Sequence, residues 1–265
     1  VLMLFVAGVV VVAILLGKSP MTLFAGLGAT SAVLMLVFKD TILGLAAGVR
    51  LTSNDMLHKG DWITVKSVDA NGIVEDMSLT TVKVRNFDNT IVTISPATLV
   101  NGSFQNWIGM QKSGGRRAKR IVYFDFRSIR LVDETLKQTL LAKHFATEDS
   151  FKLKESLQKA IEKDIQEGKD IEDLKNPAAL APTNLQLYRR FMEKYLRQRP
   201  EVNTELTLMV RHMEATQCGL PIEFYFFIKD KVWVNYEHIL ADIMEHAYAL
   251  ANEFGLKIYE QYPEQ

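Results

Sequence analysis

Two uninterrupted apolar stretches open the chain. Residues 1–17 and 21–38 contain no charged side chain, and Lys18-Ser19-Pro20 separates them. A helix of eighteen residues is about 27 Å long at about 1.5 Å per residue, close to the thickness of the hydrocarbon core of a bilayer. Residues 21–38 therefore predict a membrane-spanning helix. Residues 1–17 predict a second one, and their abrupt apolar start leads us to expect a helix that begins before this sequence does.

A signal peptide is the alternative interpretation of residues 1–20. Such a peptide has a basic leading region and a cleavage motif of small residues, and neither is present here. A hairpin of two helices is therefore favoured.

The helical pattern continues beyond the second apolar stretch. Lys39-Asp40 interrupts the apolar run, so we expect a bend there, and residues 21–57 are predicted to form one bent helix. In the half after the bend, Gly44 and Gly48 lie four residues apart, and one face carries Ile42, Leu45, Val49 and Thr52. A helix rich in small residues lets neighbouring helices approach closely in a bilayer.

The hydrophobic period changes from helix to strand at residue 60. Four short alternating segments, DWITV, GIVEDM, LTTVKVRNF and IVTIS, are separated by turn residues at 69–72 and at 88–89. Residues 58–110 are predicted to form a small β domain of the barrel type. Because such a domain buries a modest core, packing against copies of itself is plausible.

A second soluble domain is predicted at residues 111–265. After a basic hinge at 112–120, the predicted elements follow the order βαββαβ of a ferredoxin-like fold. They are the strand IVYFDF, a helix at 133–144, the strands TELTLMVR and IEFYFFIK, a helix at 236–254 that Gly255 ends, and the strand LKIY. Residues 145–203 are interpreted as a helical insertion, with helices at 151–167 and 185–199.

Charge and cysteine content indicate in which cellular compartment the soluble part lies. Lysine plus arginine and aspartate plus glutamate number 31 each, so the net charge is zero. More basic side chains follow the second apolar stretch (Lys39, Arg50, His58 and Lys59) than the one, Lys18, that lies in the turn before it. The soluble part is therefore predicted to face the cytoplasm, from a bacterial inner membrane. The single cysteine, Cys218, excludes an intrachain disulfide framework.

A series of short motifs in order along the chain resembles the small-conductance mechanosensitive channel family of bacteria. The motifs are Leu45-Ala46-Ala47-Gly48, Gly60-Asp61-Trp62-Ile63, Gly72-Ile73-Val74 and Ile94-Ser95-Pro96. Three further stretches look most like the miniconductance subgroup: Thr80 to Thr90, Ser103 to Trp107 and Ser113 to Arg117. The resemblance implies an α-helical membrane pore segment, an Sm-like small β barrel and a ferredoxin-like α/β domain. It also implies a homoheptamer in membrane lipid that releases ions and small solutes when membrane tension rises during hypo-osmotic shock.

The predicted pore has no cofactor and no catalytic residue, only a lumen that switches between dry and wet. Ala25, Ala29, Ala32 and Leu36 share one helical face, and a ring of Leu36 with Ala32 one turn above is our predicted constriction. Packing of Leu36 between helices or against lipid is the alternative, and Met35 or Phe38 are alternative constrictions. Gly28 and Gly44, like Gly48, are assigned to the pore lining or to close helix contact.

Charged residues near the predicted pore have open roles. Lys39 and Asp40 are assigned to the pore mouth and the bend, against the alternative that they pair with each other or reach the lipid headgroups. The basic run Lys112, Arg116, Arg117, Lys119 and Arg120 is interpreted as a solvated hinge. Lipid headgroups, side portals and nucleic acid are the alternatives for that run; no nucleic-acid partner is predicted.

Signals for an enzyme are weak. His238 and His246 lie two helical turns apart, but no metal-binding motif accompanies them, and Cys218 has no histidine partner in the sequence. We therefore predict neither metal nor enzymatic activity. Two rival functions remain: a membrane-tethered Sm-like binding or scaffold protein without a pore, and, ranked last, a membrane enzyme that uses His238 or Cys218.

Overall fold

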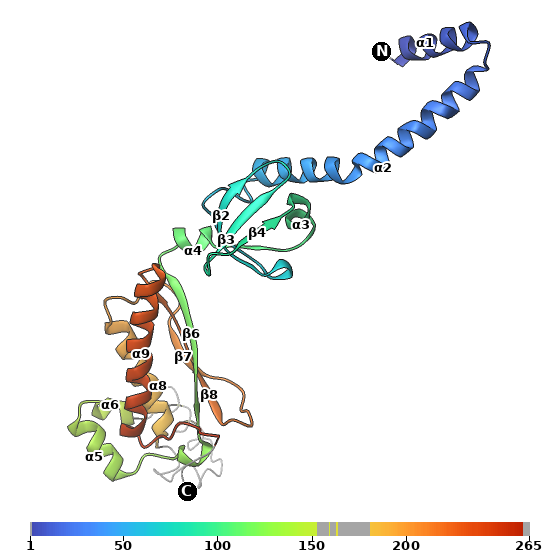
Figure 1. Ribbon diagram of the computed structural model, residues 1–265. Helices are drawn as coiled ribbons and strands as arrows, with labels where there is room; N and C mark the ends of the chain where they lie inside the picture. Colours follow the sequence, from blue (N-terminus) through green and yellow to red (C-terminus); the bar gives the residue numbers. More distant parts are fainter. Residues whose placement is uncertain (1, 153–158, 160–162, 164–180, 262–265) are drawn as a thin grey trace. The chain divides into compact units, whose positions relative to one another are not determined.

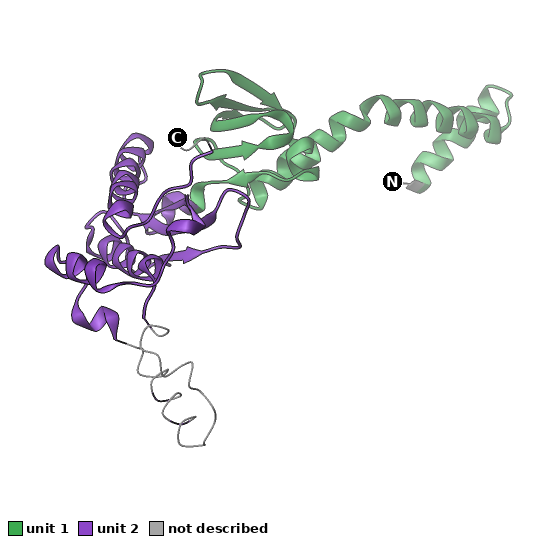
Figure 2. Ribbon diagram, turned by 90° about the horizontal axis from the view of Figure 1, so that it is seen from below, with its two compact units in different colours: residues 1–109 green, residues 110–265 purple. Residues whose placement is uncertain are grey.

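The computed structural model describes residues 2–152, 159, 163 and 181–261 and divides into two compact units. Unit 1 comprises residues 1–109 and unit 2 residues 110–265 (Figure 2). The predicted helix at 151–167 lies almost entirely outside the described residues.

Unit 1 begins with two helices, α1 (Leu2–Leu15) and α2 (Pro20–Ser53). Ser19 caps α2, because its side chain accepts a hydrogen bond from the backbone N–H of Thr22 while Pro20 occupies the first turn. Among the described residues, α2 is the one helix long and apolar enough to cross a membrane, and α1 is shorter. The helical assignment of α2 is unbroken, and Figure 1 shows that its axis changes direction partway along its length.

The rest of unit 1 is a five-stranded antiparallel sheet in the order β4-β3-β2-β1-β5. The sequence predicts the first four strands, β1 (Trp62–Val65), β2 (Ala70–Met77), β3 (Val82–Asn86) and β4 (Ile91–Ile94). It does not predict the two-residue strand β5 (Gln105–Asn106) or the short helix α3 (Pro96–Asn101). The alternate apolar residues of the strands face one core, which contains Ile63, Val65, Val74, Val82 and Val84.

Unit 2 contains a three-stranded antiparallel sheet in the order β6-β8-β7, formed by β6 (Arg116–Phe124), β7 (Met209–His212) and β8 (Leu220–Ile228). Its longer helices are α5 (Glu134–Ala142), α8 (Asn184–Gln198) and α9 (Trp233–Glu253), and α6 (Glu148–Phe151) is a single turn. The predicted last strand LKIY is reduced to one bridge between Phe124 and Ile258. With that bridge at the edge, the order along the sheet is the ferredoxin-like one, and the predicted fold class is confirmed.

Local sequence signals explain the ends of these helices. The side chains of Asp133 and Thr183 accept hydrogen bonds from the backbone at the starts of α5 and α8. Gly255 follows α9 with φ +65°, the left-handed conformation that glycine adopts without steric cost. One core joins the helices to the sheet, with Tyr188, Phe124, Phe224, Phe226 and Phe254 as its largest buried side chains.

The predicted basic hinge at 112–120 is wrong over most of its length. Helix α4 (Ile108–Lys112) covers its first residue, and Arg116 to Arg120 belong to strand β6, which pairs with β8 from Arg116 opposite Ile228 to Phe124 opposite Leu220. Ala118 is fully buried among the charged residues. The strand is marked within the basic run by Ala118 alone, which is buried between exposed Arg117 and Lys119, and the alternation lapses at Arg120, which is also exposed.

Candidate functional site

Helix α2 carries every residue assigned to the predicted pore. Because the helix is continuous from Pro20 to Ser53, residues three and four apart lie on one face. Ala25, Ala29, Ala32 and Leu36 therefore share a face as expected. All four are exposed in one protomer, and the side chain of Leu36 is 74% accessible.

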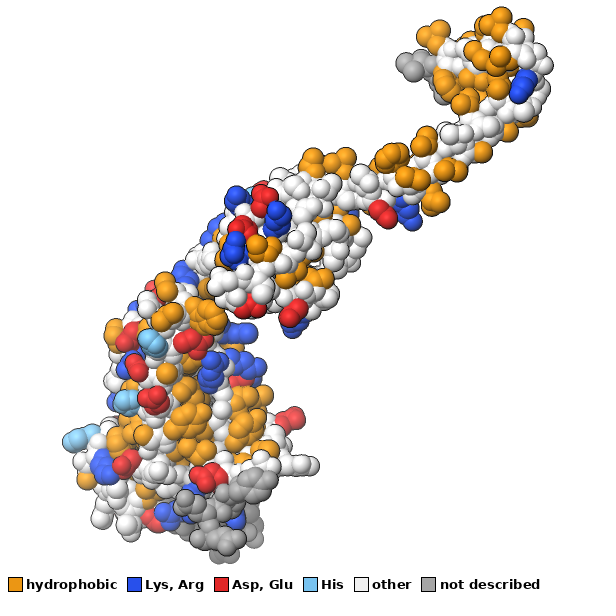
Figure 3. Space-filling view, in the orientation of Figure 1, with side chains coloured by type: hydrophobic (Ala, Val, Ile, Leu, Met, Phe, Trp, Pro, Cys, Tyr) orange, Lys and Arg blue, Asp and Glu red, His pale blue; other side chains and the backbone are white. Residues whose placement is uncertain are grey.

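Most of the surface of α2 within the apolar window is exposed in the protomer, although α1 contacts its first turns and leaves Leu23 and Phe24 half-buried. None of the eighteen-residue window is buried within the protomer, and the side chains of Met35 and Phe38 are also exposed. Figure 3 shows hydrophobic side chains along α1 and the first part of α2, with charged side chains gathered over the other parts of the chain. A single protomer therefore encloses no lumen, and lipid or other protein surfaces must cover this helix.

The second half of α2 differs because it packs on the β domain of its own chain. Ala47, Gly48 and Leu51 are buried, whereas Ile42 and Val49 on other faces are more than half exposed. A Cβ atom added at Gly48 would clash with the backbone carbonyl of Leu79 and lie 3.1 Å from the Leu79 Cα. Gly48 thus permits a close contact with the loop between β2 and β3, which the sequence pattern alone does not reveal.

The other glycines assigned to this helix have open surroundings in the protomer. A Cβ atom added at Gly28 or Gly44 would have no atom within 4 Å beyond the helix itself. Their small size therefore serves no contact within one described chain.

Lys39 and Asp40 are both exposed and helical. No ion pair joins them among the described residues, since adjacent helical positions point about 100° apart around the axis. The structure therefore leaves both charges available to solvent, headgroups or another copy of the chain.

The basic run in β6 is largely engaged within unit 2. The guanidinium of Arg116 lies 4.3 Å from the ring centre of Tyr236, and Arg120 lies 3.7 Å from Glu237. Lys119 Nζ lies 3.2 Å from Oε1 of Glu223, whose Oε2 accepts a 2.7 Å hydrogen bond from Arg211. Burial raises the pKa of Glu223, but hydrogen bonds from Arg211 and Lys119 outweigh it and lower that pKa overall.

Residues weighed for enzymatic chemistry lie apart. Cys218 is exposed in the turn between β7 and β8, and the ring of His246 stacks on Tyr195 with 5.6 Å between ring centres. Among the described residues, no group of three or more His, Cys, Asp or Glu side chains is placed to hold a metal ion. The geometry therefore supports a packing role for His246 and assigns no reaction to Cys218.

A comparison with protein families matches residues 40–109 to the family described as mechanosensitive ion channel, beta-domain. Two similar proteins come from Methanocaldococcus jannaschii. The small-conductance mechanosensitive channel MscMJ is 34% identical over 84 residues, 32% of this chain and 23% of that protein. The large-conductance mechanosensitive channel MscMJLR is 29% identical over 141 residues, 53% of this chain and 38% of that protein. This chain thus spans less than half the length of either relative.

Solved structures share the fold at low sequence identity. Arabidopsis thaliana MSL1 has a TM-score of 0.60 at 12% identity, with 98% of this chain and 73% of that chain covered. Helicobacter pylori MscS in its closed state has a TM-score of 0.57 at 12% identity, with 94% and 74% covered. At this identity the likeness establishes the fold: an apolar helix, a β-rich domain and an α/β domain in one order.

Proposed function

We propose that this chain, whose residues 40–109 match the mechanosensitive ion channel beta-domain, is one subunit of a homoheptameric, tension-gated ion channel of the small-conductance mechanosensitive channel family. Seven copies would place their α2 helices around a shared axis in a bacterial inner membrane, with the soluble domains in the cytoplasm. The proposed pore releases ions and small solutes during hypo-osmotic shock. The motifs between Thr80 and Arg117 favour the miniconductance subgroup.

One observation carries this proposal: α2 is long and apolar and none of its apolar window is buried in the protomer, yet its second half is fixed to the β domain. A simple membrane tether has no need of the close contact between Gly48 and the Leu79 backbone. A pore does, because movement of the membrane helix must be coupled to the domain below it. The proposed functional boundaries are 1–17 for a first transmembrane helix, 21–57 for the pore helix, 58–110 for the β domain and 111–265 for the α/β domain with its insertion at 145–203.

In the proposed closed state, the pore is blocked because its narrowest part contains no water. A ring of Leu36 side chains with Ala32 above it forms a narrow apolar constriction that excludes water and therefore ions. Ala25, Gly28, Ala29 and Gly44 line the lumen or let neighbouring helices approach, and Lys39 and Asp40 lie at the mouth. Membrane tension shifts the equilibrium toward the open state only as far as the two states differ in bilayer area, as a ligand shifts it only by its differential affinity.

Patch recording tests the proposed function. The chain is expressed in cells that lack their own mechanosensitive channels, and suction is applied to excised patches. We expect unitary currents whose open probability rises with pressure. Absence of pressure-dependent current, with the protein present in the membrane, contradicts the channel and favours the alternative, a membrane-tethered Sm-like binding or scaffold protein.

A further inference from the structure

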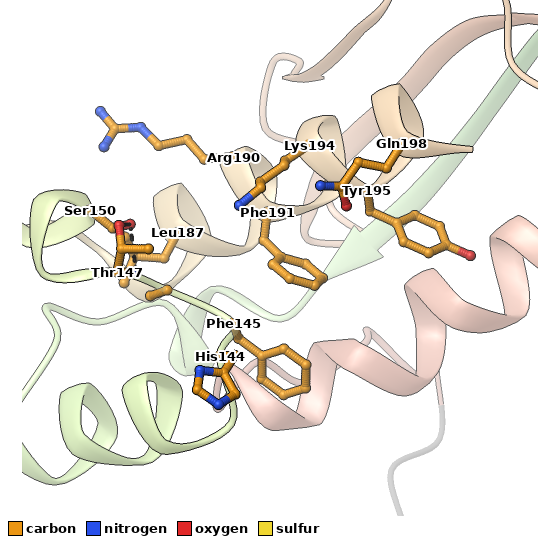
Figure 4. Close-up of a pocket in the computed structure, with 11 residues that line it drawn as sticks. His144, Phe145, Thr147, Ser150, Leu187, Arg190, Phe191, Lys194, Tyr195 and Gln198 are labelled. Atoms are coloured by element: carbon orange, nitrogen blue, oxygen red, sulfur yellow. Dashed lines mark hydrogen bonds between the residues drawn. The ribbon is translucent and has the colours of Figure 1, made fainter. Parts of the chain in front are cut away.

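Unit 2 contains a cavity of about 310 Å³ that has no part in the proposed pore. It lies between helix α8 and the segment that joins α5 to α6 (Figure 4). Its volume is at the lower end of the range for small-molecule sites, so it has room for a small metabolite and not for a larger ligand. The residues that matter for recognition are Phe145, Phe191, Tyr195, Arg190, Lys194 and Ser150.

Aromatic rings form one wall of this cavity and are held in place from behind. Phe145 and Phe191 meet edge to face with 5.3 Å between ring centres, and each also packs against the buried Phe254. Tyr195 is fixed by its stack on His246. Because the rings are positioned before any ligand arrives, a flat apolar group can pack against them with little loss of side-chain entropy.

Two cations lie on the α8 side of the cavity. Arg190 and Lys194 are one helical turn apart and both line the cavity; in Figure 4 the Arg190 side chain extends away from the aromatic rings. In the described part of the chain, neither side chain has a hydrogen bond or ion pair, whereas the neighbouring Arg189 and Glu193 bond to the backbone of Val210. No Asp or Glu occurs among the described residues that line the cavity.

This arrangement has an energetic cost that a ligand would relieve. Like charges at positions i and i+4 destabilise a helix slightly, and no carboxylate pairs with either of them within the residues that the structure describes. Thr147 and Ser150 also line the cavity; their hydroxyl groups form the capping box of α6 and lie 3.2 Å from each other. Cationic, hydroxyl and aromatic residues therefore line one small space.

We propose that this cavity binds a small organic anion in which a phosphate monoester is joined to a flat aromatic group. A phosphate monoester carries close to two negative charges at pH 7, which matches two adjacent cations better than a carboxylate does. Arg190 is suited to pair with two phosphate oxygens at once, and Lys194 acts as a second point charge. The aromatic part packs on Phe191 and Phe145. This site is independent of the proposed pore.

Calorimetric titration of the full chain in detergent tests the proposal, with adenosine monophosphate as the probe. We expect saturable binding with a dissociation constant below about 1 mM that weakens as salt is raised. Adenosine, inorganic phosphate and benzoate are the comparison ligands, because each has only part of the proposed chemistry or a single charge. Each is expected to bind at least about tenfold more weakly. Adenosine binding as tightly as the monophosphate, or benzoate doing so, overturns the assignment of a phosphate monoester.

Substitutions on α8 locate the binding. Arg190→Gln and Lys194→Gln are each expected to weaken binding about tenfold, since each removes a charge-assisted contact. Arg197→Gln is the matched control, because Arg197 is exposed on the same helix and does not line the cavity. An unchanged melting temperature establishes that the variants are folded. Equal affinity of the wild type, Arg190→Gln and Lys194→Gln, or an equal loss in Arg197→Gln, overturns the proposed site.

Discussion

Gly48 fixes the membrane helix to the β domain through the absence of a side chain. Its neighbour in space is backbone, the carbonyl group of Leu79, which cannot move aside as a flexible side chain would. The burial of Ala47 and Leu51 on either side extends the contact by one helical turn. The small-residue pattern in LAAG predicts close approach, but it does not distinguish a neighbouring helix from a loop.

Replacement of Gly48 tests this contact. Gly48→Ala is expected to destabilise unit 1 by about 1–3 kcal/mol, because the added methyl group forces the helix and the loop apart. Gly44→Ala is the control: it lies one turn away with open surroundings in the protomer and gains helix propensity. Hydrogen exchange of the backbone at residues 78–81 is the measurement. Faster exchange in Gly44→Ala than in Gly48→Ala would contradict the assignment.

Asn184 is a second residue with a structural role far greater than its size suggests. It is fully buried at the start of α8. Its amide group donates to the carbonyls of Ser128 and Phe254 at 2.9 and 3.1 Å, and its carbonyl accepts from Arg130 N–H at 3.0 Å. One side chain thereby joins three segments distant in sequence. Polar residues such as asparagine are usually found at turns, so the sequence alone gives no sign of a link across the domain.

Asn184→Ala is expected to lower the stability of unit 2 by about 3 kcal/mol or more, since it leaves several buried backbone groups without partners. Thermal unfolding of the full chain, followed by far-UV circular dichroism, measures the change. Gln186→Ala serves as the control because Gln186 is partly exposed on the same turn of α8. Equal destabilisation by the two substitutions would refute the linking role of Asn184.

At the scale of elements, the sheet of unit 2 holds a buried charge across three strands. Glu223 on β8 is fully buried, stands opposite Arg211 on β7, and lies near Lys119 on β6. Both cations are about half exposed, so they remain hydrated while they compensate the carboxylate. The cross-strand set therefore stabilises the sheet only while Glu223 is ionised.

The pH dependence of stability follows from this cross-strand set. The folded-state pKa of Glu223 is lowered, so its contribution is complete above its ordinary pKa of about 4.5 and is lost as pH falls through the folded value. Glu223→Gln is expected to lower the free energy of unfolding by about 1–3 kcal/mol at pH 7. When the pH is lowered below about 4, the variant is expected to lose less stability than the wild type does. Melting temperatures at both pH values measure this. The control, Glu237→Gln, breaks an exposed pair and is expected to cost about 1 kcal/mol or less.

How far the sequence predicts each element depends on how local its signal is. The apolar length of α2, the alternation in β1 to β4 and the caps of α5 and α8 are local, and the predicted elements are confirmed. Strand β5 depends on two residues, Gln105 and Asn106, that pair with Thr64 and Ile63 of β1, 41 and 43 positions earlier in the chain, and no local pattern marks it. The basic hinge was mistaken because Ala118 alone marks the strand within the basic run of β6. The cavity beside α8 escapes detection because its residues come from two segments far apart in the sequence, 144–150 and 187–198.

At the scale of the whole molecule, the residues that line the proposed pore depend on which face of α2 turns toward the axis. Sequence spacing defines the face of Ala25 to Leu36, but the rotation of the helix is a property of the assembly. Leu34 lies about 160° around the helix from Leu36, at 100° per residue, and has the same chemistry. A matched pair of substitutions at these positions therefore distinguishes the inward from the outward face.

Leu36→Ser is expected to let water enter the proposed constriction and to raise the open probability at fixed pressure by at least about tenfold. Leu34→Ser is expected to leave the pressure of half-maximal opening near that of the wild type. Patch recording with the same pipette geometry measures both. Easier opening in Leu34→Ser with an unchanged Leu36→Ser would place the constriction on the other face, and no effect of either would move it to Met35 or Phe38.

Assembly follows from the length of α2 compared with the thickness of a bilayer. Its 34 residues span about 51 Å, whereas the hydrocarbon core needs about 30 Å. Leu45 and Val49, beyond Lys39-Asp40, remain 44% and 52% exposed in the protomer, where lipid tails do not reach in the proposed arrangement. Apolar surface outside the bilayer needs a protein partner.

Further copies of the same helix provide that partner in the proposed channel. Native mass spectrometry from nanodiscs is expected to show one dominant heptamer. The double variant Leu45→Gln, Val49→Gln is expected to shift most of the protein to smaller species, because it replaces the apolar contact with groups that favour water. Arg50→Gln also introduces a glutamine, but on a different face of the helix, and is expected to leave the heptamer intact. If the wild-type protein is monomeric in lipid, no neighbouring helix covers Leu45 and Val49. That result would contradict the proposed channel, because a pore needs several copies of α2.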